Sequence, residues 1–288
     1  MRIAGSIRTP VLSWAAALAL ALALSAGDAR ATETPLTGLD RGFGRLYDLD
    51  FPGAQKEFAD WGAQNPDNPL GPVSEAAGVL FSEFNRLGVL EAQFYESDSA
   101  FAGRKKYEAD TRQRELFEER LARAESLGKS RLVRDPHDHD ALLGLTLANG
   151  LRADFAALIE KRSLASLHYT KESSAWAEQL LAAHPSCYDA YIAGGISKYI
   201  VGSMSAPVRW LLRVGGVSGD KARGIAELQT TADNGRLLAP FARILLAIAY
   251  VRDRDKERAR GILQSLQRDF PNNHLFPLEL ARLEKPSR

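Results

Sequence analysis

The stretch FARILLAIAYVRDRDKERARGILQSLQRDFP, residues 241–271, decides the fold. Its two halves have the apolar spacing of helices, and the polar run Arg252–Lys256 separates them before Pro271 ends the second half. Two small residues, Ala247 and Ala259, stand where antiparallel helices must approach each other closely. The larger side chains that would fill the contact are Leu246, Tyr250, Leu263 and Leu266. The stretch therefore predicts a helical hairpin, which we call the C-terminal hairpin.

This hairpin resembles the tetratricopeptide repeat, a helix pair of about 34 residues. The tryptophan that is usual early in the first helix is missing, and Arg243 stands in its place. Residues 39–66, which we call the N-terminal hairpin, follow the same order, with Gly42 as the small residue, a turn over residues 50–54 and a closing Pro66. Because two stretches share this spacing, we favour a repeat over two unrelated hairpins.

Helical spacing recurs through the rest of the chain, good helix formers dominate it, and strand-like alternation is rare. Proline-containing junctions interrupt the helices, and Asp, Asn or Ser residues in these junctions can cap the helix that follows. The junctions are residues 65–69, 135–141, 184–190 and 270–274. We therefore predict an all-α chain. Residues 32–288 would form a single tetratricopeptide-like domain, a right-handed α-solenoid of antiparallel helix pairs with irregular insertions.

The middle of the chain departs from the repeat pattern. We expect a helix over residues 140–151 whose partner, residues 173–184, follows only after an insertion at residues 154–171. A second insertion, residues 201–219, separates the helices expected at 188–202 and 220–234. The glycines and the Ala-Pro-Phe segment of residues 219–241 resemble a module of the helical-repeat family linked to inclusion-body clearance in eukaryotes. That resemblance implies no activity, since the family is regarded as non-catalytic.

The N-terminus has the plan of a secretory signal peptide. Arg2 and Arg8 precede an apolar run over residues 11–26, and Ala29-Arg30-Ala31 supplies a cleavage site. The apolar run has 16 residues, fewer than the roughly 20 that cross a bilayer. We therefore expect cleavage after Ala31 rather than a membrane anchor, no transmembrane span in the remaining chain, and a periplasmic location.

Charge and cysteine content exclude several classes of function. Lys and Arg number 37 against 36 Asp and Glu, so a formal net charge of +1 gives no overall field to attract nucleic acid. The one cysteine, Cys187, excludes an internal disulfide. We expect it to be buried beside Tyr188; the alternative is a free thiol that pairs between chains.

The motif search gives no catalytic residue, no cofactor and no metal site. His137-Asp138-His139 has zinc-like ligand types, but residues two apart do not share a helix face and no further ligand follows at a suitable spacing. Gly215–Gly219 is rich in glycine, yet it follows a helix-like segment instead of the strand that a phosphate-binding loop needs. The sequence contains no His-Glu-x-x-His and no Gly-x-Ser-x-Gly.

Binding is the function class that remains. We predict a non-catalytic scaffold or adaptor for a protein or peptide partner in the cell envelope. The alternatives are a carrier that holds a lipid or small apolar ligand between its helices, and an enzyme without a recognisable motif. Residues 237–251 are apolar nearly all round, so either a C-terminal helix at about 275–283 covers them or they form a partner groove. The candidate partner-binding residues are Tyr191, Tyr199, Met204, Trp210, Phe241, Ile244 and Ile248.

Overall fold

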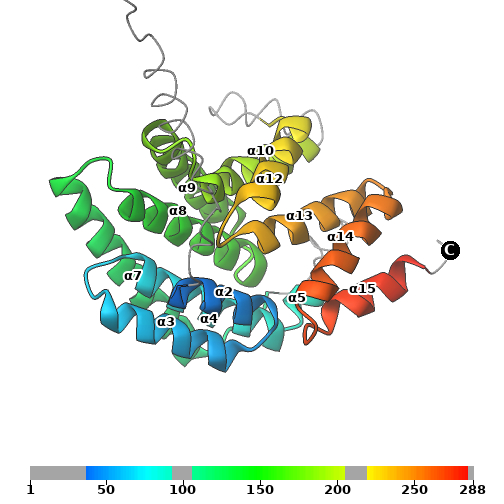
Figure 1. The fold of residues 1–288 in the computed structure, drawn as a ribbon, viewed down its shortest axis with the longest axis horizontal. Helices are drawn as coiled ribbons and strands as arrows, with labels where there is room; N and C mark the ends of the chain where they lie inside the picture. Colours follow the sequence, from blue (N-terminus) through cyan, green and yellow to red (C-terminus); the bar gives the residue numbers. More distant parts are fainter. Residues whose placement is uncertain (1–36, 93–105, 205–218, 285–288) are drawn as a thin grey trace, which may run out of the picture. The chain divides into compact units, whose positions relative to one another are not determined.

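The computed structural model describes residues 37–92, 106–204 and 219–284, and every regular element in these ranges is helical, which confirms the all-α prediction (Figure 1). In chain order, the described helices begin with α2 (Gly38–Tyr47), α3 (Phe51–Gln64), α4 (Leu70–Arg86), α5 (Val89–Ala92), α7 (Thr111–Arg134) and α8 (His139–Asp154). The later ones are α9 (Ser163–Ala183), α10 (Tyr191–Ser203), α12 (Lys221–Asn234), α13 (Ala239–Arg252), α14 (Lys256–Asp269) and α15 (Leu275–Leu283). A π-helical turn, η1 (Phe155–Ile159), follows α8, and a 3₁₀ turn, η2 (Tyr188–Ala190), precedes α10. The expected signal peptide lies outside the described residues, and Thr37–Arg288 forms one compact unit.

The inter-helix turns of the N-terminal and C-terminal hairpins have the same backbone geometry. Leu49 in one turn and Arg254 in the other each have a φ of 62°, the left-handed conformation that commonly ends a helix. The residue that follows is an aspartate in both turns. Asp50 and Asp255 each accept a hydrogen bond from the backbone amide three residues later, at 3.0 and 3.1 Å, and so cap the second helix. The two hairpins are therefore built alike, as their sequences predict.

Small residues let the helices of each hairpin approach closely. A Cβ atom at Gly42 of α2 would overlap the ring of Phe58, a residue of α3 that is fully buried. Ala247 and Ala259 hold the equivalent positions of the C-terminal hairpin and are also fully buried. This confirms the role expected for the small residues of both hairpins.

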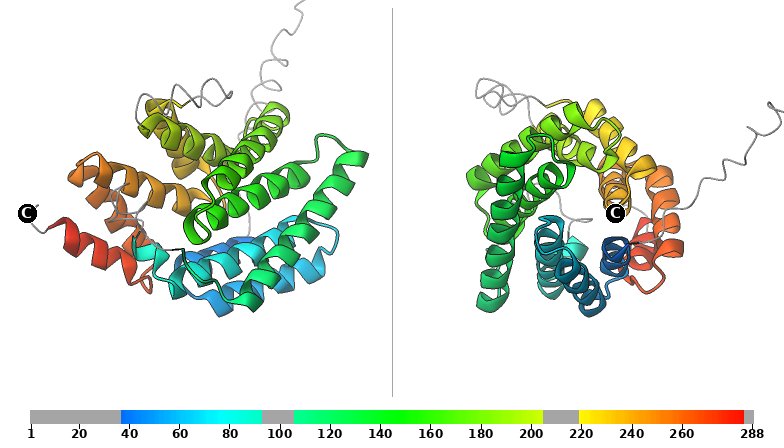
Figure 2. Two further views of the ribbon diagram at one scale, coloured as in Figure 1. Left: turned by 180° about the vertical axis from the view of Figure 1, so that it is seen from behind. Right: turned by 60° about the vertical axis from the view of Figure 1, so that its left-hand side comes forward.

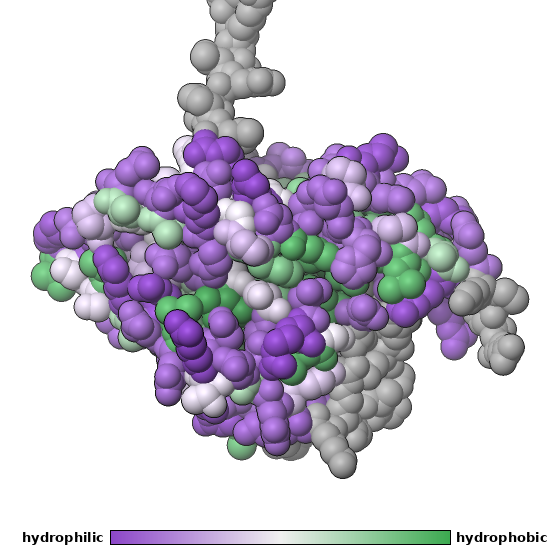
Figure 3. Space-filling view, turned by 90° about the horizontal axis from the view of Figure 1, so that it is seen from below, coloured by the Kyte–Doolittle hydropathy of each residue, from purple (hydrophilic) through white to green (hydrophobic). Residues whose placement is uncertain are grey.

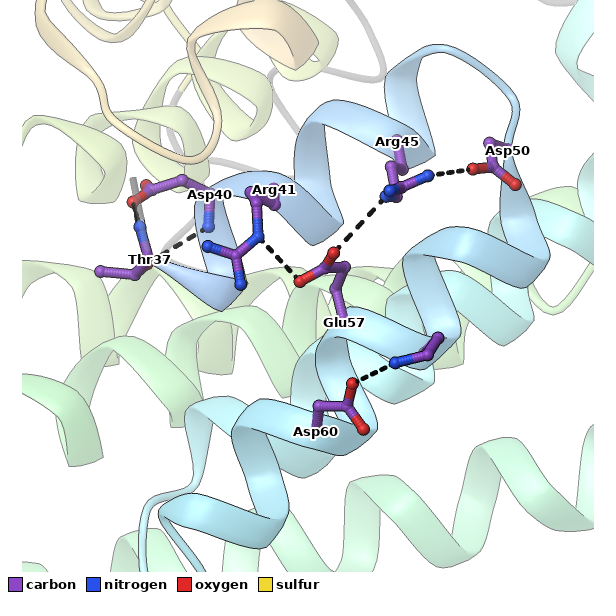
Figure 4. A network of polar contacts seen from close by, with 8 residues as sticks. Thr37, Asp40, Arg41, Arg45, Asp50, Glu57 and Asp60 are labelled. Carbon is purple, nitrogen blue, oxygen red and sulfur yellow. Dashed lines mark hydrogen bonds and ion pairs between the residues drawn. The ribbon is translucent and has the colours of Figure 1, made fainter. Parts of the chain in front are cut away.

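Ion pairs join the two helices of each hairpin, and Figure 4 shows those of the N-terminal hairpin. Glu57 of α3 accepts a hydrogen bond from Arg41 of α2 at 2.9 Å and lies 3.7 Å from Arg45. In the C-terminal hairpin, Arg243 takes the place of the usual tryptophan and donates to Asp269 at 2.7 Å. Exposed pairs of this kind contribute at most about 1 kcal/mol each. They orient the helices, whereas the buried contacts supply most of the stability.

The first three proline-containing junctions, residues 65–69, 135–141 and 184–190, are hydrogen-bonded to one another. The side-chain amide of Asn68, before α4, donates to the carboxylate of Asp140 at the start of α8, at 2.7 Å. The imidazole Nε2 of His184, after α9, lies 2.7 Å from the carbonyl oxygen of His137. Successive junctions thus contact one another, as expected for helix pairs that repeat along a solenoid.

The first described helix returns to contact the last helices, as the right-hand view of Figure 2 shows. The Tyr47 hydroxyl of α2 donates to the carbonyl oxygen of Leu237 at 2.9 Å, and the side-chain amide of Asn273 donates to the carbonyl of Tyr47 at 2.7 Å. Asp40 accepts two hydrogen bonds from Arg236, at 2.8 and 2.6 Å. The solenoid therefore closes on itself within this unit.

The middle of the chain differs from the sequence prediction. Helix α9 begins at Ser163, not at residue 173, so most of the expected insertion at 154–171 is helical. The first half of α9 buries few apolar side chains, and Leu164 is 85% exposed, so its hydrophobic periodicity is weak. The insertion expected at 201–219 lies mostly outside the described residues.

Helix α8 runs into η1 to form a central apolar stretch. Within the described ranges, His139–Ile159 is the one stretch long and apolar enough to cross a membrane, and 61% of it is buried inside the protein. It contacts α4, α7 and α9. On the face drawn in Figure 3, polar side chains predominate, and hydrophobic ones reach the surface in patches near its middle. The apolar content of α8 therefore belongs to the core.

Candidate functional site

A pocket lies between six of the helices, α2, α4, α8, α9, α10 and α13. The cavity volume is about 100 Å³, and the pocket is partly open to solvent. Roughly 10–15 Å³ of such volume holds one water molecule. The pocket therefore has room for several non-hydrogen atoms of a ligand.

The pocket is lined by single faces of its helices. Helix α8 contributes a row four residues apart, Thr146, Gly150 and Asp154, which a helical period brings onto one side. Helix α4 contributes a similar row that includes Ala77. At Gly150 an added Cβ would have a single close neighbour, the Ser173 hydroxyl at 3.6 Å, so the glycine leaves open space inside the pocket.

Most of the lining is apolar. Phe43 of α2, Ile192 and Ile196 of α10, and Phe241 of α13 all face the pocket. The Phe241 ring packs edge-on against Phe81 of α4, with ring centroids 5.6 Å apart. A surface of this kind gains free energy when it takes an apolar molecule out of water.

Three hydroxyl groups of the pocket lining already donate hydrogen bonds to backbone carbonyls of the protein. Thr146 donates to the carbonyl of Leu142, Thr170 to that of Ser166, and Ser173 to that of Thr146, each at 2.8 Å. A hydroxyl carries one proton, so these three groups can offer only lone pairs to a molecule in the pocket.

Asp154 is the one carboxyl group among the lining residues. It ends α8, and no described residue forms a hydrogen bond or ion pair with its side chain. Burial alone raises the pKa of Asp154 to about 7, because a carboxylate loses hydration there and gains no partner. The chain then enters η1, where the Glu160 amide donates to the carbonyl of Phe155 at 3.1 Å. Such π-helical turns are frequent at functional sites.

Of the candidate partner-binding residues that the structure describes, Phe241 lines the pocket and the other five do not. Ile248 belongs to a buried cluster with Phe276 of α15, and Ile244 packs against the same cluster. This confirms that the C-terminal helix covers that side of α13.

The remaining candidates surround α10. Tyr199 is 9% exposed, and the Lys221 ammonium lies 5.9 Å from its ring centroid. The Tyr191 ring stacks on that of Tyr188, with centroids 6.4 Å apart. Met204, directly after α10, is half-buried. Trp210 lies outside the described residues.

Sequence analysis missed Asp154, which it assigned to an insertion. The signal was present, because Asp154 follows Thr146 and Gly150 at four-residue spacing on an apolar helix, so it shares their buried face. A carboxyl on such a face is rarely buried without a partner, and it marks a site worth testing.

A second cluster of titratable groups lies at the junctions around His139. Its Nδ1 atom is 2.9 Å from the Asp140 carboxylate, and its ring packs edge-on against that of His184. The Asp140 carboxylate and then the Cys187 sulfur accept hydrogen bonds from the imidazole, which raises the pKa of His139 to about 10. Cys187 is buried, as expected. Across the described ranges, no group of three or more His, Cys, Asp or Glu side chains is placed to hold a metal ion.

No protein-family model matches the sequence, and no curated protein matches it. Among solved structures, the chain is similar to a thermophilic TPR protein of Thermus thermophilus. The TM-score is 0.41 and the identity 16%, with 85% of this chain and 96% of that one covered. The inclusion-body resemblance finds no support in these comparisons. The description as stacked helix pairs rests on the turns, caps and packing of the chain itself.

Proposed function

We propose that this chain is a non-catalytic carrier that binds a small, mainly apolar molecule in the pocket between its helices. The observation that carries the proposal is the pocket itself, a cavity of about 100 Å³ that opens to solvent and is lined mainly by apolar side chains from six helices. Burying apolar surface there is worth about 25 cal/mol for each Å² removed from water.

The closure of the solenoid favours a small ligand over a long peptide. Open helical repeats bind extended segments along a concave surface. Here Tyr47 and Asn273 join α2 to the C-terminal helices, and residues of α2 form part of the pocket lining. A molecule in the pocket therefore contacts the first described helix, α2, as well as α13.

Export to the periplasm is part of the proposal. It rests on the signal-peptide plan of residues 1–31. An apolar molecule that crosses an aqueous compartment needs a protein that shields it from water. The pocket and the expected export therefore support the same function.

The test uses two substitutions at Gly150. Gly150→Leu extends a side chain into the open space of the pocket, whereas Gly150→Ala adds a single methyl group next to Ser173. Both remove a glycine from a helix interior, so we expect both to fold and to gain about 0.5–1 kcal/mol from helix propensity. Isothermal titration calorimetry with decanol should show binding by wild type and Gly150→Ala, and none by Gly150→Leu. Equal binding by all three proteins would contradict the proposal.

A protein-interaction scaffold is the second candidate. Its support is exposed apolar surface around α10, where Ile200 is 48% exposed and Tyr188 is 38% exposed. The test is a crosslinking pulldown from cell envelopes with Ile200→Asp. The matched control is Val133→Asp, on α7, where the side chain is 86% exposed. If the protein is a scaffold, wild type and the control should both capture the same envelope protein, and Ile200→Asp should fail to capture it.

A further inference from the structure

The pocket contains one carboxyl group, that of Asp154, for which the described chain provides no counterion. Asp154 has no hydrogen-bond or ion-pair partner among the described residues, although it lines a mainly apolar cavity. An ionised carboxylate in such surroundings is costly unless a cation or a hydrogen-bond donor accompanies it. Asp154 is half-buried and faces a partly open pocket, so either water or a ligand that carries a donor can complete this site.

The other lining residues that the structure describes supply no free hydrogen-bond donor. The three hydroxyls on α8 and α9 donate to backbone carbonyls, as described above. The Tyr47 hydroxyl donates to the carbonyl of Leu237, so its proton is committed as well. The lining residues of α4, α10 and α13 are apolar. Every polar side chain of the pocket therefore offers oxygen lone pairs, which suit a ligand that brings donors.

No cation of the neighbouring helices neutralises Asp154. Arg152, two residues earlier on α8, is paired with Glu118 and Glu125 of α7. Lys171 follows the lining residue Thr170 on α9, but its side chain is exposed at the surface. Among residues 37–92, 106–204 and 219–284, no charged neighbour offsets the effect of burial on the Asp154 carboxyl group.

We propose that the pocket takes an amphiphilic amine, with its protonated nitrogen on the Asp154 carboxylate and its apolar chain among the lining helices. This inference rests on the carrier function proposed above and adds the chemical class of the ligand. An ammonium group supplies both the positive charge and the donors that the pocket lacks. A fatty acid would instead place a second carboxylate beside the first.

Binding of the amine is coupled to proton release. The pKa of Asp154 is about 7 in the empty pocket, so about half of the molecules hold the proton at pH 7. The ammonium pairs with the carboxylate, and the proton leaves to solvent. Apparent affinity for the amine should therefore fall as pH drops below 7, approaching about tenfold for each pH unit.

The experiment compares decylamine, decanol and decanoate by isothermal titration calorimetry at pH 8 and pH 5. At pH 8 wild type should bind decylamine about 10- to 100-fold more tightly than decanol, and decanoate most weakly. Asp154→Asn should lose the preference for the amine and keep its affinity for decanol. The matched control is Glu178→Gln, an acid-to-amide change at an exposed position of α9, and it should behave as wild type.

The outcomes separate the two proposals. If decylamine and decanol bind wild type equally well at pH 8, the cation site is wrong while the apolar pocket stands. If none of the three compounds binds, the carrier function fails and this inference fails with it. If Asp154→Asn does not fold, the affinities of wild type at pH 8 and pH 5 test the cation site instead. A site that depends on the carboxylate should bind decylamine more weakly at pH 5 and bind decanol equally well at both pH values.

Discussion

Replacing Asp154 by asparagine should change how the stability of the protein depends on pH. Burial raises the pKa of this carboxyl group from its ordinary value of 3.8 to about 7 in the folded state. The folded protein therefore holds the proton more tightly than the unfolded chain. The Asp154 carboxyl group therefore lowers the free energy of unfolding as pH rises from about 4 to about 7.

The size of the effect follows from the shift. A difference of about three pKa units, at about 1.36 kcal/mol per unit, is a penalty of about 4 kcal/mol above pH 7. About 3 kcal/mol of it develops between pH 5 and pH 8. The asparagine amide does not titrate, so its own burial cost is the same at both pH values. Between pH 5 and pH 8, the free energy of unfolding of Asp154→Asn should therefore rise by about 3 kcal/mol relative to that of wild type.

Urea unfolding followed by far-ultraviolet circular dichroism at pH 5, 6, 7 and 8 measures this shift. Glu178→Gln is the control, and its stability should run parallel to wild type. If Asp154→Asn also runs parallel to wild type, the carboxyl group is not held in an apolar site and the description of the pocket is wrong.

Three further substitutions test the fold. Tyr47→Phe removes the buried hydrogen bond to the Leu237 carbonyl and should cost about 1–2 kcal/mol in urea unfolding; no change would mean that the closure contributes nothing. Asp255→Ala removes the cap of α14 and should cost about 1 kcal/mol in the same assay. Burial, reinforced by the charge of Glu91, outweighs the ion pair with Arg282 at 3.4 Å and raises the pKa of Glu279 to about 8. Glu279→Gln should therefore gain thermal stability relative to wild type as pH rises from 6 to 9, and an unchanged difference would contradict that.

The hairpins could be predicted because their determinants are local. The prolines, the turn aspartates and the small residues at the helix contact all lie within one stretch of about 30 residues. Asp50 and Asp255 cap α3 and α14 through bonds to amides three residues away. Interactions of such short range leave a pattern in the sequence itself.

The closure and the pocket could not be predicted, because they depend on residues far apart in the chain. The hydrogen bonds of Tyr47 join positions 190 and 226 residues apart. Phe241 was expected on a partner-binding surface, and its place in the pocket depends on α2 and α4 packing near α13. Asp154 was assigned to an insertion, although its four-residue spacing from Gly150 places both residues on one face of α8.

The most direct test of the central claim is a crystal structure of residues 32–288 grown with 10-bromodecanol, in which anomalous scattering locates the bromine. The account predicts a bromine peak between the helices, beside Phe241 and Gly150, in wild type and in Gly150→Ala, and none there in Gly150→Leu. A peak confined to the outer surface, or no peak at saturating concentration, would contradict the claim that this pocket binds an apolar molecule.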